Sequence, residues 1–116
     1  MTALSSEDSP VYLRLRATIA AGILRGDYRA GDQLPSVRAF AAEHGANPLT
    51  VAKAYQGFQD EGLVVVRRGV GMFVADGARD RLATSERTAF IRTEWPQIRA
   101  RMERLGIDIA DLMERH

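Results

Sequence analysis

Apolar residues recur at helical spacing near the start of the chain. Positions three or four residues apart lie on one face of a helix, so this spacing predicts a helix with one buried face. The Ser9-Pro10 pair marks its beginning, because a serine hydroxyl can cap free N–H groups and proline has no N–H that needs a partner there. Gly26 is a typical helix end. The apolar residues are Tyr12, Leu15, Ile19 and Ile23.

Two shorter helices are predicted next. The segments 37–44 and 48–61 each follow a side-chain oxygen that can cap a helix, from Ser36 and Asn47, and each ends at a glycine. Only residues 45–47 separate them, which is the spacing of a helix-turn-helix. The apolar residues expected to face inward are Phe40, Ala41, Val51, Tyr55 and Phe58.

The pattern then changes to that of β-strands. β-Branched and aromatic residues fill 63–68 and 72–75, and the two glycines within 69–71 can form a tight turn between them. A β-hairpin is therefore predicted. The segment 33–35, further upstream, is too short for more than an edge strand.

Residues 78–116 are predicted to form a helical tail. Pro96 lies inside its longest helix, and an internal proline removes a hydrogen bond and clashes with the preceding turn. We therefore expect a kink or a break just before it. Gly106 should end this helix, and Asp108 can cap a last short one that carries Ile109 and Leu112. The long helix has a heptad-like apolar seam of Ile91, Trp95, Ile98, Met102 and Leu105.

Composition argues against an enzyme. The chain has 116 residues and no cysteine, so disulfides, thiolate nucleophiles and Cys-ligated zinc are absent, which fits a reducing cytoplasm. The two histidines, His44 and His116, have no partner at metal-ligand spacing. No apolar run is long enough to span a membrane and no secretory signal is visible. We expect no catalytic residue, no metal, no cofactor and a cytoplasmic location.

The helix-turn-helix spacing favours DNA binding. The apolar face of the segment 48–61 leaves Leu49, Thr50, Lys53 and Gln56 facing outward. A hydroxyl and an ammonium suit phosphates, an amide suits a base edge, and a leucine suits a thymine methyl group. An ordinary solvated helix face has the same spacing, and the net charge of +1 favours no particular partner.

Several motifs in order resemble one family. Pro10-Val-Tyr12, Gly31-Asp-Gln-Leu-Pro-Ser-Val-Arg38, Asn47-Pro-Leu-Thr-Val51, Glu61-Gly-Leu63 and Arg68-Gly-Val-Gly-Met-Phe-Val74 resemble the winged helix of GntR-type bacterial transcription regulators. Asn47-Pro48 and the short tail resemble the YtrA-like branch, in which a small helical tail makes a homodimer. The resemblance implies a mainly α fold with a small β-hairpin: a winged helix-turn-helix DNA-binding domain at 10–75 and a helical dimerisation tail at 78–116.

The resemblance also implies DNA-contacting residues. Arg38 matches a family arginine that contacts DNA, and Gly69 matches the wing glycine that approaches the minor groove. Arg68 is expected at the groove, whereas Arg67, on the opposite face of the strand, is expected near Asp60-Glu61. The predicted set is Ser36, Arg38, Asn47, Leu49, Thr50, Lys53, Gln56, Arg68 and Gly69.

The recognition helix departs from the family at some positions. Many members carry arginines where this chain has Pro48 and Ala52, and Leu49 replaces a residue that is often polar in the branch. Lys53 is the natural substitute cation. No operator sequence is therefore carried over.

These patterns predict a dimeric, sequence-specific DNA-binding regulator, a repressor that acts on a two-fold symmetric operator. The alternative is a winged-helix module that binds protein instead of DNA; a fragment of an aminotransferase-like fusion is disfavoured because no lysine follows Lys53. An unknown small-molecule effector could bind between the domains. The predicted dimer contacts are Ile91, Trp95, Ile98, Met102, Leu105, Ile109 and Leu112.

Overall fold

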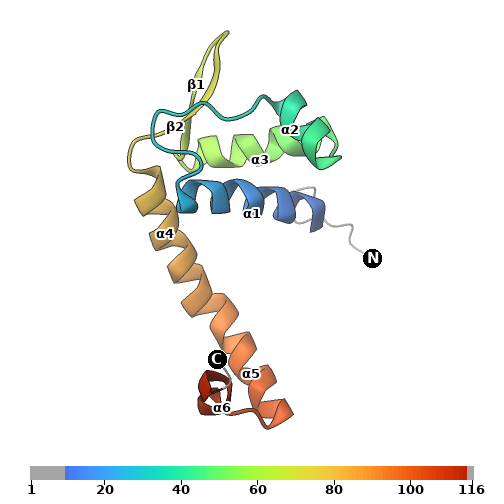
Figure 1. Cartoon of the computed structure of the whole chain (residues 1–116), viewed down its shortest axis with the longest axis vertical. Coiled ribbons are helices and arrows are strands. Elements are labelled where there is room, and N and C mark those ends of the chain that lie inside the picture. The colour runs from blue at the N-terminus through green and yellow to red at the C-terminus, as the bar shows by residue number, and fades with distance from the viewer. Residues whose placement is uncertain (1–9, 115–116) are drawn as a thin grey trace. The chain divides into compact units, whose positions relative to one another are not determined.

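The computed structural model describes residues 10–114, which form two compact units. The first ends at Leu82 and the second begins at Ala83. Ser9 and His116, considered above, lie outside the described residues. The first unit contains α1 (Pro10–Arg25), α2 (Val37–His44), α3 (Pro48–Asp60), β1 (Val64–Arg67), β2 (Gly71–Val74) and the start of α4 (Ala78–Ala89), as Figure 1 shows.

The predicted caps fix the ends of α2 and α3. The Ser36 hydroxyl accepts a hydrogen bond from the Ala39 N–H at 3.0 Å, and the Asn47 side chain accepts one from the Leu49 N–H at 2.8 Å. Gly45 ends α2 with φ +61°, a left-handed conformation that glycine adopts without strain. The helix-turn-helix is therefore confirmed with the predicted boundaries, except that α3 ends at Asp60.

The hairpin is extended by a third segment of chain. β1 and β2 are antiparallel, with Val64 opposite Val74 and Arg67 opposite Gly71. Residues 31–34 run along the free side of β2, where the Leu34 N–H donates to the Met72 carbonyl at 2.9 Å. This segment forms a single β-bridge to Phe73, which agrees with the short edge strand predicted at 33–35.

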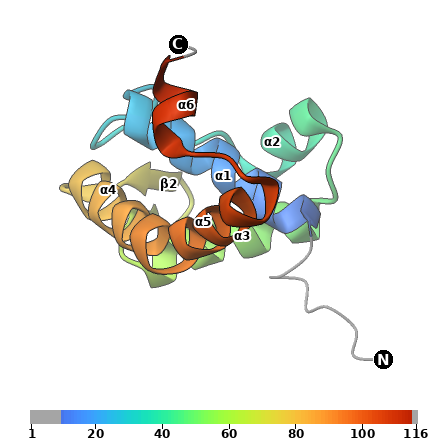
Figure 2. The same ribbon diagram turned by 90° about the horizontal axis from the view of Figure 1, so that it is seen from below.

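The first unit has one core. Helices α1, α2 and α3 pack together (Figures 1 and 2), and the hairpin projects past them in Figure 1. The predicted inward-facing residues of all three helices are buried in this core. Ala78 and Leu82 are buried in it as well, so the start of α4, up to Leu82, packs with the winged helix. The guanidinium groups of Arg79 and Arg81 donate to the carbonyls of Leu24 and Gly62, which holds this part of α4 in place.

The second unit contains the rest of α4, the π-helical segment Phe90–Glu94, α5 (Trp95–Leu105) and α6 (Ile109–Glu114). The disturbance expected before Pro96 takes the form of this π-helical turn. Proline has no N–H for the usual bond and clashes with the carbonyl four residues earlier, and a wider turn relieves the clash. The Trp95 N–H accordingly donates to the Phe90 carbonyl, five residues back.

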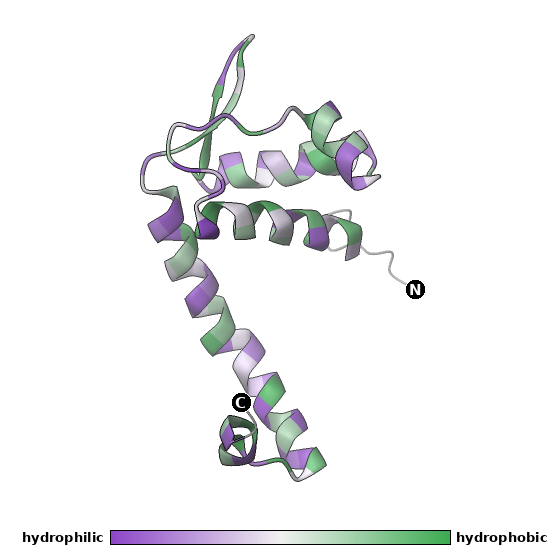
Figure 3. Cartoon of the chain, in the orientation of Figure 1, coloured by the Kyte–Doolittle hydropathy of each residue, from purple (hydrophilic) through white to green (hydrophobic). Residues whose placement is uncertain are grey.

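The second unit has almost no interior of its own. The π-helical segment, α5 and α6 bury none of their residues, and hydrophobic and hydrophilic residues alternate along the helices in Figure 3. Trp95 and Met102 are half-buried, whereas the side chains of Ile91 and Leu105 are 53% and 61% exposed. No helix within the described part of the chain is long and apolar enough to cross a membrane.

Candidate nucleic-acid interface

Helix α3 presents one exposed face directly opposite its buried face. Val51, Ala54, Tyr55 and Phe58 are buried, and at 100° per residue their centre lies on the far side of the helix from Leu49, Lys53 and Gln56. Leu49 is 74% exposed. The structure therefore brings these three predicted contacts together on one surface, which we call the α3 face.

The other predicted residues of this region lie beside the α3 face. Thr50 is half-buried and lines a hollow with Arg14 and Thr18 of α1, about a quarter-turn away from Leu49. The Asn47 side-chain oxygen is occupied by its capping bond. Thr50 thus departs from the predicted outward orientation, because its position on the helix turns it toward α1.

The start of α2 offers an unpaired cation. Arg38 is exposed, and no ion pair among the described residues engages it. It lies in the first turn of α2, where the free N–H groups carry partial positive charge. Ser36 uses its hydroxyl as the helix cap. An anion near this turn would therefore meet both the Arg38 guanidinium and the helix terminus.

A buried tyrosine joins the two helices. The Tyr55 hydroxyl donates to the Pro35 carbonyl at 2.7 Å, and its ring packs edge-on against Phe40 with ring centroids 6.0 Å apart. Burial raises the pKa of the Tyr55 phenol far above its usual value, so the hydroxyl stays protonated and keeps its bond. Because Pro35 directly precedes Ser36, this bond fixes the start of α2 relative to the α3 face.

The wing carries Arg68 and Gly69 in its turn. Gly69 was predicted there, whereas Arg68 was predicted at the end of the first strand, which in fact ends at Arg67. Gly69 has φ +76° and is exposed, and the Val70 N–H donates to the Arg67 carbonyl at 2.9 Å, which closes the turn. A glycine is required here because other residues rarely adopt this conformation. Arg68 is exposed beside it.

The prediction for Arg67 is wrong. Its guanidinium lies over the Phe73 ring, 4.5 Å from the centroid, because the two residues are diagonal neighbours on one face of the hairpin. Asp60 accepts a hydrogen bond from the Gln56 amide at 2.9 Å, and Glu61 forms a 2.6 Å ion pair with Arg16 of α1. Arg67 is therefore held by the hairpin itself.

Sequence reasoning missed Gln33 as a support of the wing. Its side-chain amide donates to the Val70 carbonyl in the wing turn at 2.9 Å. A Cβ atom at Gly71 would collide with the same amide, so glycine permits this close approach. Nothing in the sequence pairs residues 37 positions apart, and it is the pairing of residues 31–34 with β2 that brings the amide to the turn.

Comparison with known proteins decides the family. Residues 11–74 match the family described as bacterial regulatory proteins, gntR family. The chain belongs to the GntR family. It is 31% identical over 106 residues to the HTH-type transcriptional repressor YtrA of Bacillus subtilis, covering 91% of this chain and 81% of YtrA.

Solved structures agree with this assignment. A transcriptional regulator from Oenococcus oeni has a TM-score of 0.69 and 28% identity, with 98% of this chain and 92% of that chain covered. The DNA-binding domain of AraR in complex with operator ORR3 has a TM-score of 0.55 and 26% identity, with 65% and 92% covered. The predicted winged helix with a helical tail and the predicted class, a DNA-binding transcription regulator and not an enzyme, are confirmed.

Proposed function

We propose that this GntR-family chain acts as a homodimeric repressor that binds a two-fold symmetric operator in double-stranded DNA. The observation that most supports this function is the α3 face. It presents an apolar, a cationic and an amide side chain opposite the buried side of α3, the recognition helix. The relative YtrA is a transcriptional repressor, and the related domain of AraR is bound to operator DNA. A regulator of this kind acts in the cytoplasm.

On the α3 face, each side chain has a distinct role. Leu49 contacts a thymine methyl group, the Lys53 ammonium binds a phosphate, and Gln56 donates to a base edge. The Gln56 Nε2 donates one hydrogen to Asp60 at 2.9 Å, so its second hydrogen and the side-chain oxygen supply the contact to the base edge.

Cations around the α3 face contact the DNA backbone. Arg38 binds a phosphate or a guanine beside α2, and Arg68 reaches the groove next to the wing, where Gly69 lets the turn approach closely. Asn47 and Thr50 lie at the start of α3 and Ser36 lies at the start of α2. At these positions they contact phosphates. The net charge of only +1 means that affinity depends on these placed cations.

The second unit supplies the dimer contact. It buries no residue of α5 or α6, and a winged helix of this size alone presents one small DNA surface. A second copy of the chain covers the exposed apolar seam. The DNA-binding surfaces of the two copies are then linked and bind one operator together. The proposed contacts are Ile91, Trp95, Ile98, Met102, Leu105, Ile109 and Leu112.

Titration of the full chain against its own upstream DNA tests this function. We expect saturable binding to that duplex, weaker binding to a scrambled duplex, and loss of this preference in Arg38→Ala. A module that binds protein instead predicts equal, weak binding to both duplexes and no effect of Arg38→Ala or Thr50→Ala. That outcome would refute DNA recognition.

Sedimentation tests the dimer separately. The chain cut after Leu82 keeps the core residues of α4 and should be monomeric, whereas the full chain should sediment as a dimer at micromolar concentration. If the full chain and the shortened chain are both monomeric, the proposed tail contact is wrong. If both are dimeric, the dimer contact lies in the first unit.

A further inference from the structure

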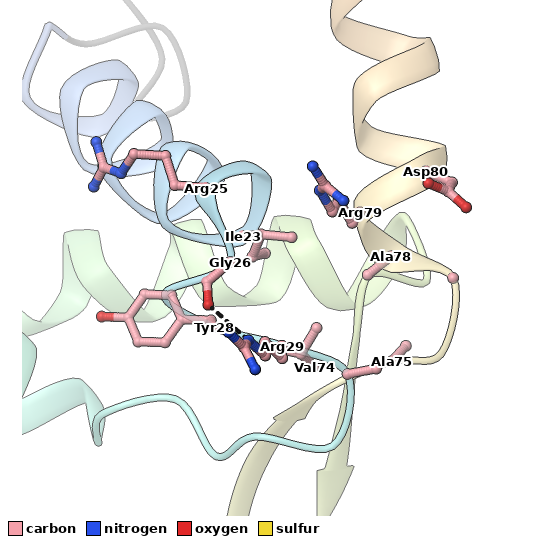
Figure 4. Close-up of a pocket in the computed structure, with 12 residues that line it drawn as sticks. Ile23, Arg25, Gly26, Tyr28, Arg29, Val74, Ala75, Ala78, Arg79 and Asp80 are labelled. Carbon is pink, nitrogen blue, oxygen red and sulfur yellow. Dashed lines mark hydrogen bonds between the residues drawn. The ribbon is translucent and has the colours of Figure 1, made fainter.

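A cleft opens in the first unit where α4 begins. It lies between the end of α1, the turn at 26–30, the end of β2 and the first turn of α4, and its volume is about 490 Å³ (Figure 4). This volume is in the range of small-molecule sites. Its apolar wall consists of the half-buried Tyr28 and Ala75 above buried core residues, and Arg29 and Arg79 also line it. None of the lining residues belongs to the α3 face or to the wing turn at 68–70.

The two arginines come from opposite walls and are held in place by main-chain carbonyls. The Arg29 Nε donates to the Gly26 carbonyl at 3.3 Å, and the Arg79 Nε donates to the Leu24 carbonyl at 3.1 Å. Within residues 10–114, neither guanidinium forms an ion pair, and the Nη atoms of both have no hydrogen-bond partner. Two positioned guanidinium groups with free Nη donors are suited to carboxylate and phosphate oxygens.

The remaining charges near the cleft do not neutralise this pair. Arg25 forms an ion pair with Asp27 at 3.0 Å, and its guanidinium points away from Arg29 in Figure 4. Asp80 also lines the cleft, but its side chain points to the side of α4 away from α1 in the same view. Asp32 accepts a bond from the Arg29 main-chain N–H at 2.8 Å, which leaves the guanidinium uninvolved.

The start of α4 adds unpaired main-chain donors. The N–H groups of Arg79 and Asp80 have no main-chain or side-chain acceptor among the described residues, and no side chain caps this helix. Free N–H groups in the first turn carry the positive end of the helix dipole. An apolar wall, two guanidinium groups and a helix terminus therefore border one cleft.

We propose that this cleft binds a small organic anion whose carboxylate or phosphate group contacts Arg29 and Arg79. The carbon part of the ligand packs on the half-buried Tyr28 and Ala75. A ligand that bridges the 26–30 turn and α4 stabilises the attachment of α4, the helix that continues into the tail. Anion binding in this cleft does not depend on the proposed function, whereas a regulatory effect of the anion on operator binding rests on it.

Calorimetric titration of the full chain tests the proposal with citrate and, separately, inorganic phosphate at matched ionic strength. We expect saturable binding of at least one probe, and the stronger of the two identifies the preferred anionic group. Arg29→Gln and Arg79→Gln should each weaken it about tenfold or more, because each removes a charge-assisted contact. Arg87→Gln, an exposed arginine further along α4, should leave it unchanged. Arg29→Gln keeps the bond from Arg79 to Leu24 and so remains informative if Arg79→Gln unfolds.

Three results would overturn the anion site. The first is the lack of saturable binding of either probe at millimolar concentration. The second is that Arg87→Gln weakens anion binding as much as the Arg29 and Arg79 variants do. The third is that the Arg29 and Arg79 variants keep anion binding but lose affinity for duplex DNA, which would make the cleft a contact for the DNA backbone. The calorimetric titration contains no DNA. A chain that does not bind its operator would therefore refute the proposed function and leave the anion site standing.

Discussion

Replacing Gln33 with alanine should weaken DNA binding through the wing, although Gln33 itself is not proposed to contact DNA. Its amide donates to the Val70 carbonyl at 2.9 Å inside the wing turn, next to Arg68 and Gly69. The main-chain bridge to Phe73 does not involve the amide and remains in the variant. Only the support of the turn is therefore lost.

The size of the effect follows from one exposed, neutral hydrogen bond. Such a bond contributes about 0.5–1.5 kcal/mol net. About 1 kcal/mol, the middle of this range, changes an equilibrium constant about fivefold, so Gln33→Ala should lower DNA affinity by about that factor. The loss cannot exceed that of Arg68→Ala, a charged contact of about 1.5–3 kcal/mol, because Gln33 acts only by positioning the turn.

A double-mutant cycle on one duplex at fixed salt tests this reasoning. Gln33→Ala should lower affinity in the native background and have almost no further effect in the Arg68→Ala background. Gln97→Ala, an exposed glutamine on α5, is the matched control and should be silent. Additive effects of Gln33→Ala and Arg68→Ala would refute the proposed support of the wing.

Three other predictions can be checked on the same duplex or by denaturation. Arg38→Ala should cost about 1–3 kcal/mol per half-site and relax sequence preference, whereas Lys53→Ala should weaken all duplexes alike and reduce the salt slope by about one. Equal effects of both on cognate and random DNA would show that Arg38 is wrongly assigned. Arg68→Ala should lower DNA affinity about tenfold. Because the Arg67 guanidinium stacks on the Phe73 ring, Arg67→Ala should change DNA affinity little and stability by under about 1 kcal/mol. A larger loss of affinity in Arg67→Ala than in Arg68→Ala would reverse the two roles. Folding raises the pKa of Tyr55, so the folded state holds this proton more tightly and stability should fall as pH rises above about 10. Tyr55→Phe should cost about 1–3 kcal/mol at neutral pH in urea titrations, since the Pro35 carbonyl loses its donor, and should remove this share of the alkaline loss; an unchanged alkaline slope would contradict the assignment.

The helical boundaries were predictable because their causes are local. Ser36 and Asn47 cap helices within three residues of themselves, and Gly45 ends α2 through its own φ angle. Pro96 disturbs the turn directly before it for an equally local reason. The α3 face followed from the spacing of its buried residues, which also required only the local helical period.

Features that depend on distant pairs could not be predicted. Arg67 was assigned to the acids at 60–61, but Glu61 is engaged by Arg16, 45 positions earlier in the chain. The hairpin register then offers Arg67 the Phe73 ring instead. Leu82 lies within the tail predicted at 78–116, and only tertiary packing shows that it is part of the core of the first unit.

Footprinting of the full chain on its own upstream region tests the central claim most directly. A homodimer that presents two α3 faces should protect two half-sites related by two-fold symmetry, with centres about 10 base pairs or a multiple of that apart. Arg38→Ala should weaken both halves equally. A single unsymmetrical footprint, or no protection at concentrations where the protein is a dimer, would contradict the account.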